Sequence, residues 1–410
     1  MNRQRGMTMI ELMVSLAIVM VVIGAATTAY LKLLRTYRTQ GKLAESYLAN
    51  LTGLEMLRYD IETAGFGLPV GLAAGATYSE ANDSTVQYYN PANLNDSPNN
   101  APRAIAHLNN SGANNSDILT IKSSAANLFN DPTSKKWSMI LAAGSNPFYP
   151  ANPTVKLWGI TVLDPVMDFT INDNFIVLDN NGILQPAAGQ WSCYTFNTAL
   201  PNGGYYANAS SLPYPTSNKN VYYIYGLDNS TNNPAGAHRM PFNRVDYYLD
   251  KILGPPSQFP NSCAASTFTL YRSTINQVDG TLNKAPLIDC VRDFQVAFGL
   301  ATNLDGNVNS WVQTLAGMSA AQIQQQVREV RVFLLYQEGL GDTAKLPGQG
   351  FSNSGSSDFR FSGTLNLGDQ DTGNLSSFNP ATGPNYNAKD SQYRWKVLEM
   401  DIKPMNLNSN

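Results

Sequence analysis

The sequence predicts an α+β fold in which one long N-terminal helix packs on a strand-rich, antiparallel-sheet head. Three observations support this prediction. An uncharged, mostly apolar run of 20 residues at 12–31 is bounded by Glu11 and Lys32. A helical apolar pattern then continues to about residue 64. From residue 68 onward, apolar residues occur in short runs separated by Asn, Ser, Gly and Pro, as in a head built from strands.

The apolar run has the length of a membrane span. At about 1.5 Å per residue it extends about 30 Å as a helix, which is the thickness of the hydrocarbon core of a bilayer. Arg3 and Arg5 precede it, and the positive-inside rule then keeps the N-terminus in the cytoplasm and places the rest of the chain across the membrane. A cleaved signal peptide ending near 24–26 is the alternative, but the run exceeds the usual roughly 7–15 apolar residues of such peptides.

The helix is expected to continue past the membrane as an amphipathic segment. Apolar residues recur there at steps of three, four or seven, and two more widen the stripe: Leu43, Tyr47, Leu48, Leu51, Leu54, Leu57 and Ile61. Gly65 and Pro69 then predict the end of the helix, because glycine favours a left-handed cap and proline prevents continuation.

The head is expected to contain many short strands. The clearest candidates are at 118–121, 175–178, 221–225, 245–249, 268–272, 294–298, 330–336 and 397–402. Several alternate polar with apolar residues, which is typical of sheets buried on one face. A short helix is expected at 319–326, with Ser319 as its N-cap.

Composition argues against several function classes. Lys plus Arg number 27 against 30 Asp plus Glu, and the net charge of −3 gives no overall attraction for nucleic acid. The two histidines, His107 and His238, lie far apart in the sequence, which disfavours most zinc sites and His-based triads. No nucleotide-binding or hydrolase motif is present. We therefore expect a binding protein without a cofactor, and no enzyme.

Glu11 is unusual because a carboxylate at the edge of an apolar span costs a few kcal/mol if it enters lipid without a partner. A position among the lipid headgroups would avoid this cost. Gly6, the following residues 7–10, Glu11 and the apolar helix resemble the class III signal of type IV pilins and pseudopilins. The resemblance implies that prepilin peptidase cuts after Gly6 and that the new amine of Met7 is methylated. It also implies that Glu11 pairs with the N-terminal amine of a neighbouring subunit.

Further segments resemble the PilW family of minor pilins in order and spacing. They lie at 58–67, 116–121, 269–272, 286–299, 327–335 and 393–402. Insertions near 123–220 and 340–390 match no known pattern. The resemblance implies a pilin-like fold with a leader at 1–6, a long helix at 7–64, whose transmembrane part is about 12–31, and a periplasmic head at 68–410.

The family resemblance also implies a function. A PilW-like minor pilin would prime type IV pilus assembly together with other minor pilins, the major pilin and an inner-membrane assembly platform. It would be a single-pass inner-membrane protein that enters the pilus or its tip, and it would support adhesion and twitching motility. A pseudopilin at the tip of a type II secretion system is the close alternative. A membrane-anchored periplasmic hydrolase using Asp164, Asp168 or Asp289 is an alternative of another class.

One loop has the spacing of oxygen ligands for calcium. Asn303, Asp305, Asn307 and Asn309 occur at alternate positions, and Gly306 permits a tight turn between them. An Asn-rich hairpin turn without metal explains the same residues, since the group contains a single carboxylate. Calcium is therefore an open expectation.

Three cysteines in an oxidising periplasm predict one disulfide and one thiol. Cys263 and Cys290 precede the expected strands 268–272 and 294–298, so adjacent pairing of these strands would bring the two sulfurs together. Cys193 would then be a free, buried thiol. A bridge between Cys193 and Cys263 is the alternative.

Overall fold

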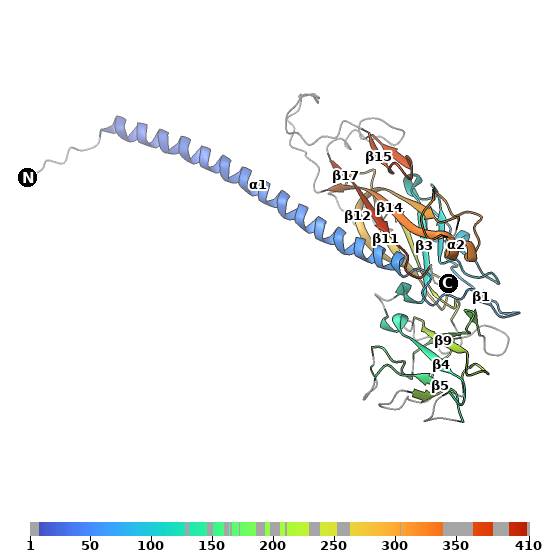
Figure 1. Cartoon of the computed structure of the whole chain (residues 1–410). Helices are drawn as coiled ribbons and strands as arrows, with labels where there is room; N and C mark the ends of the chain where they lie inside the picture. The colour runs from blue at the N-terminus through green and yellow to red at the C-terminus, as the bar shows by residue number, and fades with distance from the viewer. Residues whose placement is uncertain are drawn as a thin grey trace, which may run out of the picture.

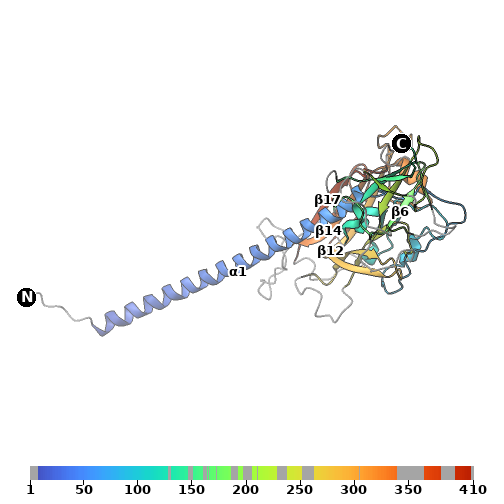
Figure 2. The ribbon, with the colours of Figure 1, turned by 90° about the horizontal axis from the view of Figure 1, so that it is seen from below.

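The computed structural model shows a long helix that projects from a strand-rich head (Figure 1). The structure describes residues 8–407 except 128–130, 146–150, 160–163, 165, 172, 186–192, 197–205, 210, 229–237, 252–262, 304, 339–363 and 380–392, and it leaves out the side chains at 35, 36, 38–40, 42–50, 206, 207 and 394. The view from below shows the same helix extending away from the head (Figure 2). The α+β fold class predicted from the sequence is confirmed.

Helix α1 runs without a break from Met9 to Glu62. Its first part, Met9–Leu34, is long and apolar enough to cross a membrane, and none of it is buried in the head. Its last turns enter the head, where Leu57 and Ile61 are fully buried. Leu51 was expected on the buried stripe, but 45% of its surface is exposed, because the head begins to cover α1 only near Gly53 and Leu54. The side chains of Leu43, Tyr47 and Leu48 lie outside the described part.

The main sheet is antiparallel and has the strand order β17-β14-β12-β11-β10-β3-β2, with β13 paired to β12. Its strands are β2 (Ile105–Leu108), β3 (Ile118–Ser123), β10 (Asn243–Asp250), β11 (Phe268–Ile275), β12 (Leu282–Leu300), β13 (Ser310–Val312), β14 (Val327–Glu338) and β17 (Arg394–Ile402). The short helix α2 (Ala320–Gln326) leads into β14 and begins with a capping box between Ser319 and Gln322.

Strand β12 makes the main sheet curl around the end of α1. Its first half pairs with β11 and its second half with β14, and the change of partner lies next to Cys290, whose φ is 57°. The far half of β12 then lies against β2 and the residue before β3. The rings of His107 and Phe298 are 5.0 Å apart, and Asp117 N donates to Phe294 O at 2.8 Å.

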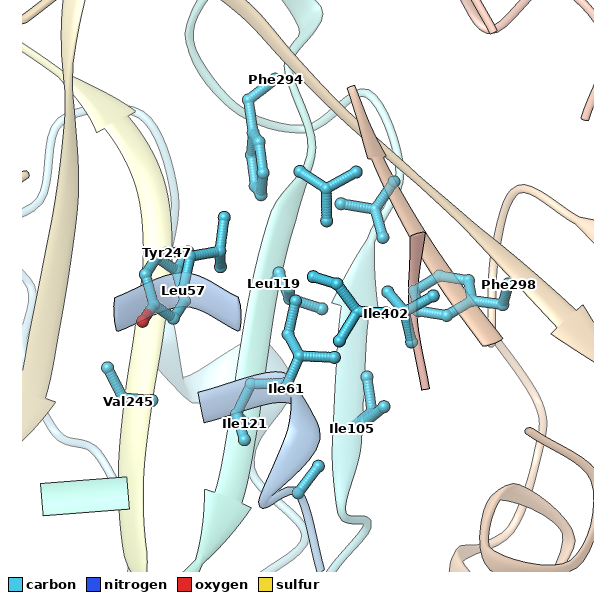
Figure 3. Packing of buried hydrophobic residues seen from close by; sticks show 14 of the residues in the cluster. Leu57, Ile61, Ile105, Leu119, Ile121, Val245, Tyr247, Phe294, Phe298 and Ile402 are labelled. Atoms are coloured by element: carbon cyan, nitrogen blue, oxygen red, sulfur yellow. The ribbon is translucent and has the colours of Figure 1, made fainter. Parts of the chain in front are cut away.

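The main hydrophobic core lies inside this curl. Figure 3 shows Leu57 and Ile61 of α1 surrounded by side chains from the curled strands. The labelled neighbours are Ile105, Leu119, Ile121, Val245, Tyr247, Phe294, Phe298 and Ile402. Burying an aliphatic side chain of this size contributes about 1.5–3 kcal/mol, so this packing fixes the helix to the head.

A second sheet is formed by β1 together with the strands that lie between β3 and β10 in the sequence. Its strand order is β1-β7-β6-β9-β4-β5-β8, and only β1 with β7 is parallel. The strands are β1 (Gly71–Leu72), β4 (Trp137–Leu141), β5 (Thr154–Lys156), β6 (Phe175–Leu178), β7 (Ile183–Leu184), β8 (Tyr206–Asn208) and β9 (Val221–Gly226). Strands β4 to β8 lie in the insertion near 123–220, which matched no family pattern, so part of this insertion builds an accessory sheet with its own core.

The remaining elements are short. A two-stranded hairpin consists of β15 (Leu365–Leu367) and β16 (Ser376–Phe378). Four 3-10 helices connect strands within the described residues: η1 (Pro91–Leu94), η2 (Ala113–Asn115), η3 (Ser124–Asn127) and η4 (Pro132–Lys135).

The expectation of one-sided sheets is wrong for the centre of the main sheet. Every residue of β3, β10 and β11 is buried. The core around α1 covers one face, and a second cluster that includes Tyr78, Tyr89 and Phe242 covers the other. Polar residues that alternate along β3 and β10 are therefore buried, and ion pairs compensate the buried charges of Lys122, Arg244 and Asp246.

These ion pairs form a buried cluster on the far face. The Lys122 ammonium is 2.7 Å from Glu80 Oε2 and 2.6 Å from Asp96 Oδ2. The Arg244 guanidinium is 3.1 Å from Glu80 Oε2 and 2.9 Å from Asp246 Oδ1. Burial opposes the charge on Arg244, but Asp246 and Glu80 outweigh it and raise the pKa of the guanidinium. The cluster ties the segment around Glu80 and Asp96 to β3 and β10.

Candidate functional site

The N-terminal end of α1 is closed by a capping box between Thr8 and Glu11. Thr8 N and Thr8 Oγ1 donate to Glu11 Oε2 at 2.9 and 3.1 Å, and Glu11 N donates to Thr8 Oγ1 at 3.4 Å. This arrangement satisfies backbone donors at the helix start. Gly6 and Met7, the expected cleavage and methylation positions, lie outside the described residues.

Three hydroxyl groups in the membrane-length part of α1 form hydrogen bonds within the helix. The hydroxyls of Ser15, Thr27 and Thr28 donate to the carbonyl oxygens of Leu12, Ile23 and Gly24 at 2.8–2.9 Å. In lipid such groups find no water, so internal hydrogen bonds are required. Glu11 is the only Asp, Glu, Lys or Arg between residues 9 and 31. No residue of opposite charge therefore lies within 9–31 to neutralise it.

The docked end of α1 approaches the sheet closely. A Cβ added at Gly53 would lie 2.9 Å from Leu287 O of β12, so only glycine allows this backbone approach. After the helix, Gly65 N donates to Lys122 O at 3.0 Å and Ser124 N donates to Phe66 O at 2.7 Å. Near the C-terminus, Met405 N donates to Glu62 O at 2.9 Å. The helix end is thus bonded to β3 and to the chain after β17.

A buried ion pair completes this junction, and it was not predicted from the sequence. Asp60 is fully buried, and its carboxylate accepts from Arg272 Nε at 2.7 Å, from Arg272 Nη2 at 3.3 Å and from the Tyr247 hydroxyl at 2.5 Å. Burial raises the pKa of Asp60, while Arg272 and Tyr247 act against this rise. Burial likewise opposes the charge on Arg272, but Asp60 outweighs it and raises the pKa of the guanidinium.

One signal for this pair was present in the sequence. Asp60 stands three residues after Leu57 and one before Ile61, so it lies on the buried stripe of the helix. A charge in that position needs a buried partner. The partner itself, more than 200 residues away in β11, could not be identified from helical spacing.

The cysteines form the expected pair, but the strand argument for it is wrong, because 268–272 pairs with 285–291 of β12 whereas 294–298 pairs with β14. Cys263 and Cys290 form a disulfide with a Cα–Cα distance of 5.1 Å, and it joins the residues before β11 to β12. Cys193 is buried and does not take part in a disulfide. Its sulfur lies 3.3 Å from His238 Nδ1, and His238 Nε2 lies 2.9 Å from Asp228 O. Burial lowers the pKa of His238, so the imidazole is neutral at neutral pH.

The expected calcium ligands lie together in an exposed turn between β12 and β13. Asn303 Nδ2 donates to Asp305 Oδ2 at 2.8 Å, and Asn307 N donates to Asp305 Oδ1 at 2.8 Å, a bond that lowers the pKa of Asp305. Asn309 Oδ1 accepts from Thr302 N at 3.0 Å. Among the described residues, no group of three or more His, Cys, Asp or Glu is placed to hold a metal ion. Both interpretations of this loop, the metal-free turn and the calcium site, stay predictions.

Two of the carboxylates considered for a hydrolase, those of Asp168 and Asp289, accept hydrogen bonds from nearby protein groups. Asp168 is buried and accepts from the backbone N–H groups of Trp158, Gly159 and Asp164 at 2.6–3.0 Å. Asp289 is exposed and accepts from the Thr269 hydroxyl at 2.8 Å. The hydrogen bonds of Asp168 stabilise a loop, and the hydrogen bond of Asp289 links β12 to β11. The geometry gives no reason to assign them a reaction.

Comparison with known proteins finds family models that match two separate parts of this chain. A family model of the prokaryotic N-terminal methylation motif matches residues 1–27. A family model of type IV pilus-assembly protein W matches residues 261–403, which contain β11, β12, β14 and β17. No curated protein and no solved structure matches the chain significantly. The second model therefore covers much of the sheet on which α1 docks.

Proposed function

We propose that this chain, a type IV pilin-like protein of the PilW family, is a minor pilin that primes type IV pilus assembly within a complex of minor pilins. Its head would lie in the periplasm on a single membrane-spanning helix before assembly, and in the pilus or its tip afterwards. The partners would be other minor pilins, the major pilin and the inner-membrane assembly platform. Pilins and PilW proteins are structural components, so we propose no catalytic step.

The observation that carries this proposal is the continuity of α1. One unbroken helix joins an exposed, membrane-length segment, Met9–Leu34, to a docked end in the head. There Leu57 and Ile61 share a core with Val291, Phe294 and Ile402, all within the segment that the PilW model matches. Such a helix holds the head at a fixed orientation to the membrane. It also presents an apolar stem that neighbouring helices can pack against in a fibre.

Glu11 provides the proposed contact between subunits. Among the described residues, its carboxylate has hydrogen bonds from Thr8 and no ion pair with Lys or Arg. Cleavage after Gly6 by prepilin peptidase would create an amine at Met7 in each subunit. Pairing of Glu11 with the amine of a neighbour would neutralise the carboxylate when helices leave the lipid for the fibre.

The experiment replaces Glu11 by Ala in the native strain. We expect normal processing, shown by a mature chain that begins at Met7, but reduced recovery of the protein with sheared pili. The matched control is Glu55→Ala, which removes an exposed carboxylate from the same helix. Equal incorporation of both variants would contradict the role of Glu11, and a mature chain that begins beyond Ala26 would favour an ordinary signal peptide.

A type II secretion pseudopilin is the second candidate, because it uses the same type of signal and helix. The match of residues 261–403 to a pilus-assembly protein favours the pilus. Secretion of an exoprotein in a strain that lacks this chain distinguishes the two machines. Normal piliation with failed secretion would favour the pseudopilin.

A further inference from the structure

The part of α1 that follows the apolar run is strongly basic. Within 11 positions it contains four basic residues: Lys32, Arg35, Arg38 and Lys42. No Asp or Glu occurs between residues 12 and 44, so neither Arg35 nor Arg38 has an acidic residue three or four positions away on the helix. Local pairs along α1 therefore do not compensate these two charges.

The described part of the head is too distant to compensate them. It begins to cover α1 near Gly53 and Leu54, and Figure 1 shows the preceding part of the helix extending away from the head. At about 1.5 Å per residue, position 38 lies about 22 Å along the helix from Gly53. Salt screens exposed charges beyond about 8 Å at physiological ionic strength. Acidic residues in the described head therefore have little influence on this segment.

The basic segment lies at the level of the lipid headgroups when α1 spans a membrane. If residues 12–31 fill the hydrocarbon core, positions 35 and 38 lie about 6 and about 10 Å beyond its boundary along the unbroken helix. The headgroup region extends about 5–7 Å from the same boundary. Long Lys and Arg side chains near the end of a span extend toward this region. Lipid phosphates are therefore within reach of these positions.

Helical periodicity separates a basic side from an aromatic side in this part of α1. At about 100° per residue, the four basic positions fall within an arc of about 120°. Tyr30, Leu33 and Tyr37 fall on the opposite side, where they are 60%, 68% and 76% exposed. Tyrosine is enriched where membrane helices meet water. The segment 30–42 therefore has the amphipathic pattern of a membrane boundary, with its positive charge gathered on one side.

We propose that the basic side of α1 at 32–42 binds anionic phospholipids, such as phosphatidylglycerol, in the leaflet next to the head. The attraction is between opposite charges, so a zwitterionic lipid such as phosphatidylcholine is bound less tightly. Each Lys or Arg near an anionic lipid surface strengthens binding about fivefold. This lipid binding depends on the membrane anchoring proposed above, but it does not depend on a role in pilus assembly.

Electron spin resonance of spin-labelled lipids tests this binding in bilayers. The full-length protein is reconstituted into phosphatidylcholine vesicles with a trace of spin-labelled phosphatidylglycerol or phosphatidylcholine, and the fraction of label immobilised by the protein is measured. We expect phosphatidylglycerol to associate about fivefold more strongly at low salt, and this preference to fall toward one at about 1 M NaCl. Equal association of the two lipids at low salt would overturn the proposal.

Substitutions assign the preference to the basic side of α1. The variant Arg35→Gln, Arg38→Gln and Lys42→Gln keeps good helix formers and should lose most of the preference, whereas an unchanged preference would overturn the proposal. The matched control removes three charges at exposed positions of the head and should keep the preference: Lys135→Gln, Lys219→Gln and Lys403→Gln. An equal loss in this control would contradict the assignment to α1.

Two further measurements separate the lipid binding from its premises. Arg35→Lys with Arg38→Lys keeps both charges and should keep the preference, and its loss would contradict an attraction between charges. Flotation of the vesicles shows whether the protein is anchored in them. Wild-type protein that does not float with the vesicles would contradict the membrane anchoring and the lipid binding together, whereas flotation without a preference for phosphatidylglycerol would overturn the lipid binding alone.

Discussion

The buried ion pair between Asp60 and Arg272 gives the sharpest prediction for the junction of helix and head. Asp60→Ala removes three hydrogen bonds to a carboxylate that is fully buried, and it leaves the Arg272 guanidinium without its counter-ion. Breaking one side of such a pair costs about 3–5 kcal/mol, because the remaining charge stays buried. We expect a loss of this size in the free energy of unfolding.

The matched control, Glu62, lies two residues further along the same helix, on a more exposed side. Glu62 pairs with Arg58 at 2.8 Å, but the Arg58 and Glu62 side chains are 54% and 21% exposed. Exposed pairs of this kind contribute about 0–1 kcal/mol. Glu62→Ala should therefore cost less than 1 kcal/mol. Urea unfolding of the full-length protein in detergent, followed by near-UV circular dichroism, measures both variants.

A variant that lacks both charges distinguishes the cost of an unpaired buried charge from the cost of losing a side chain. Asp60→Leu combined with Arg272→Met removes both charges, and the apolar replacement should restore much of the stability that Asp60→Ala loses. If Asp60→Ala costs no more than Glu62→Ala, or if the double variant is less stable than Asp60→Ala, the ion pair does not fix the helix as described.

The remaining predictions address the core, the disulfide, one histidine and the calcium loop. Leu57→Ala should cost about 2–5 kcal/mol in urea unfolding, because it leaves a cavity where α1 meets the sheet. Cys263→Ser with Cys290→Ser should lose about 3 kcal/mol in the same assay, since the disulfide closes a loop of 27 residues. Burial lowers the pKa of His238, so the unfolded chain takes up the proton first, and the stability is complete above pH 6.5 and declines as pH falls. Comparing wild type with His238→Gln at pH 7.5 and 5.5 measures this term, and a larger acid loss in the variant would contradict it. Calcium should leave the thermal midpoint of wild type and Asp305→Asn unchanged; a calcium-dependent rise in wild type alone would establish a site.

Local patterns predicted the parts of this fold that depend on local physics. The segment 175–178 was identified from an apolar run, and β6 has the same bounds. Ser319 was expected to cap a helix, and it does so through a capping box with Gln322. Both features depend on residues a few positions apart, which helix and strand periodicity describe well.

Features that depend on distant contacts were not predictable. Lys122 and Arg244 resemble solvent-facing residues of alternating strands, yet both are fully buried, because a second layer covers that face of the sheet. Two strands of the accessory sheet were expected, at 175–178 and 221–225, but their assembly into a separate sheet was not, because its other strands are short and pair across long gaps in the sequence. Of the candidate site, the motif around Glu11 was visible from sequence alone, whereas the Asp60 and Arg272 pair required the fold.

Pilus counts in a deletion strain test the central claim, that this chain primes type IV pilus assembly, most directly. Surface pili are counted by electron microscopy in the wild type, in the deletion strain and in the deletion strain that carries the gene on a plasmid, while the membrane pool of major pilin is measured by immunoblot. We predict few or no pili in the deletion strain, an undiminished pool of major pilin in the membrane, and recovery on complementation. Normal pilus numbers in the deletion strain would contradict the claim.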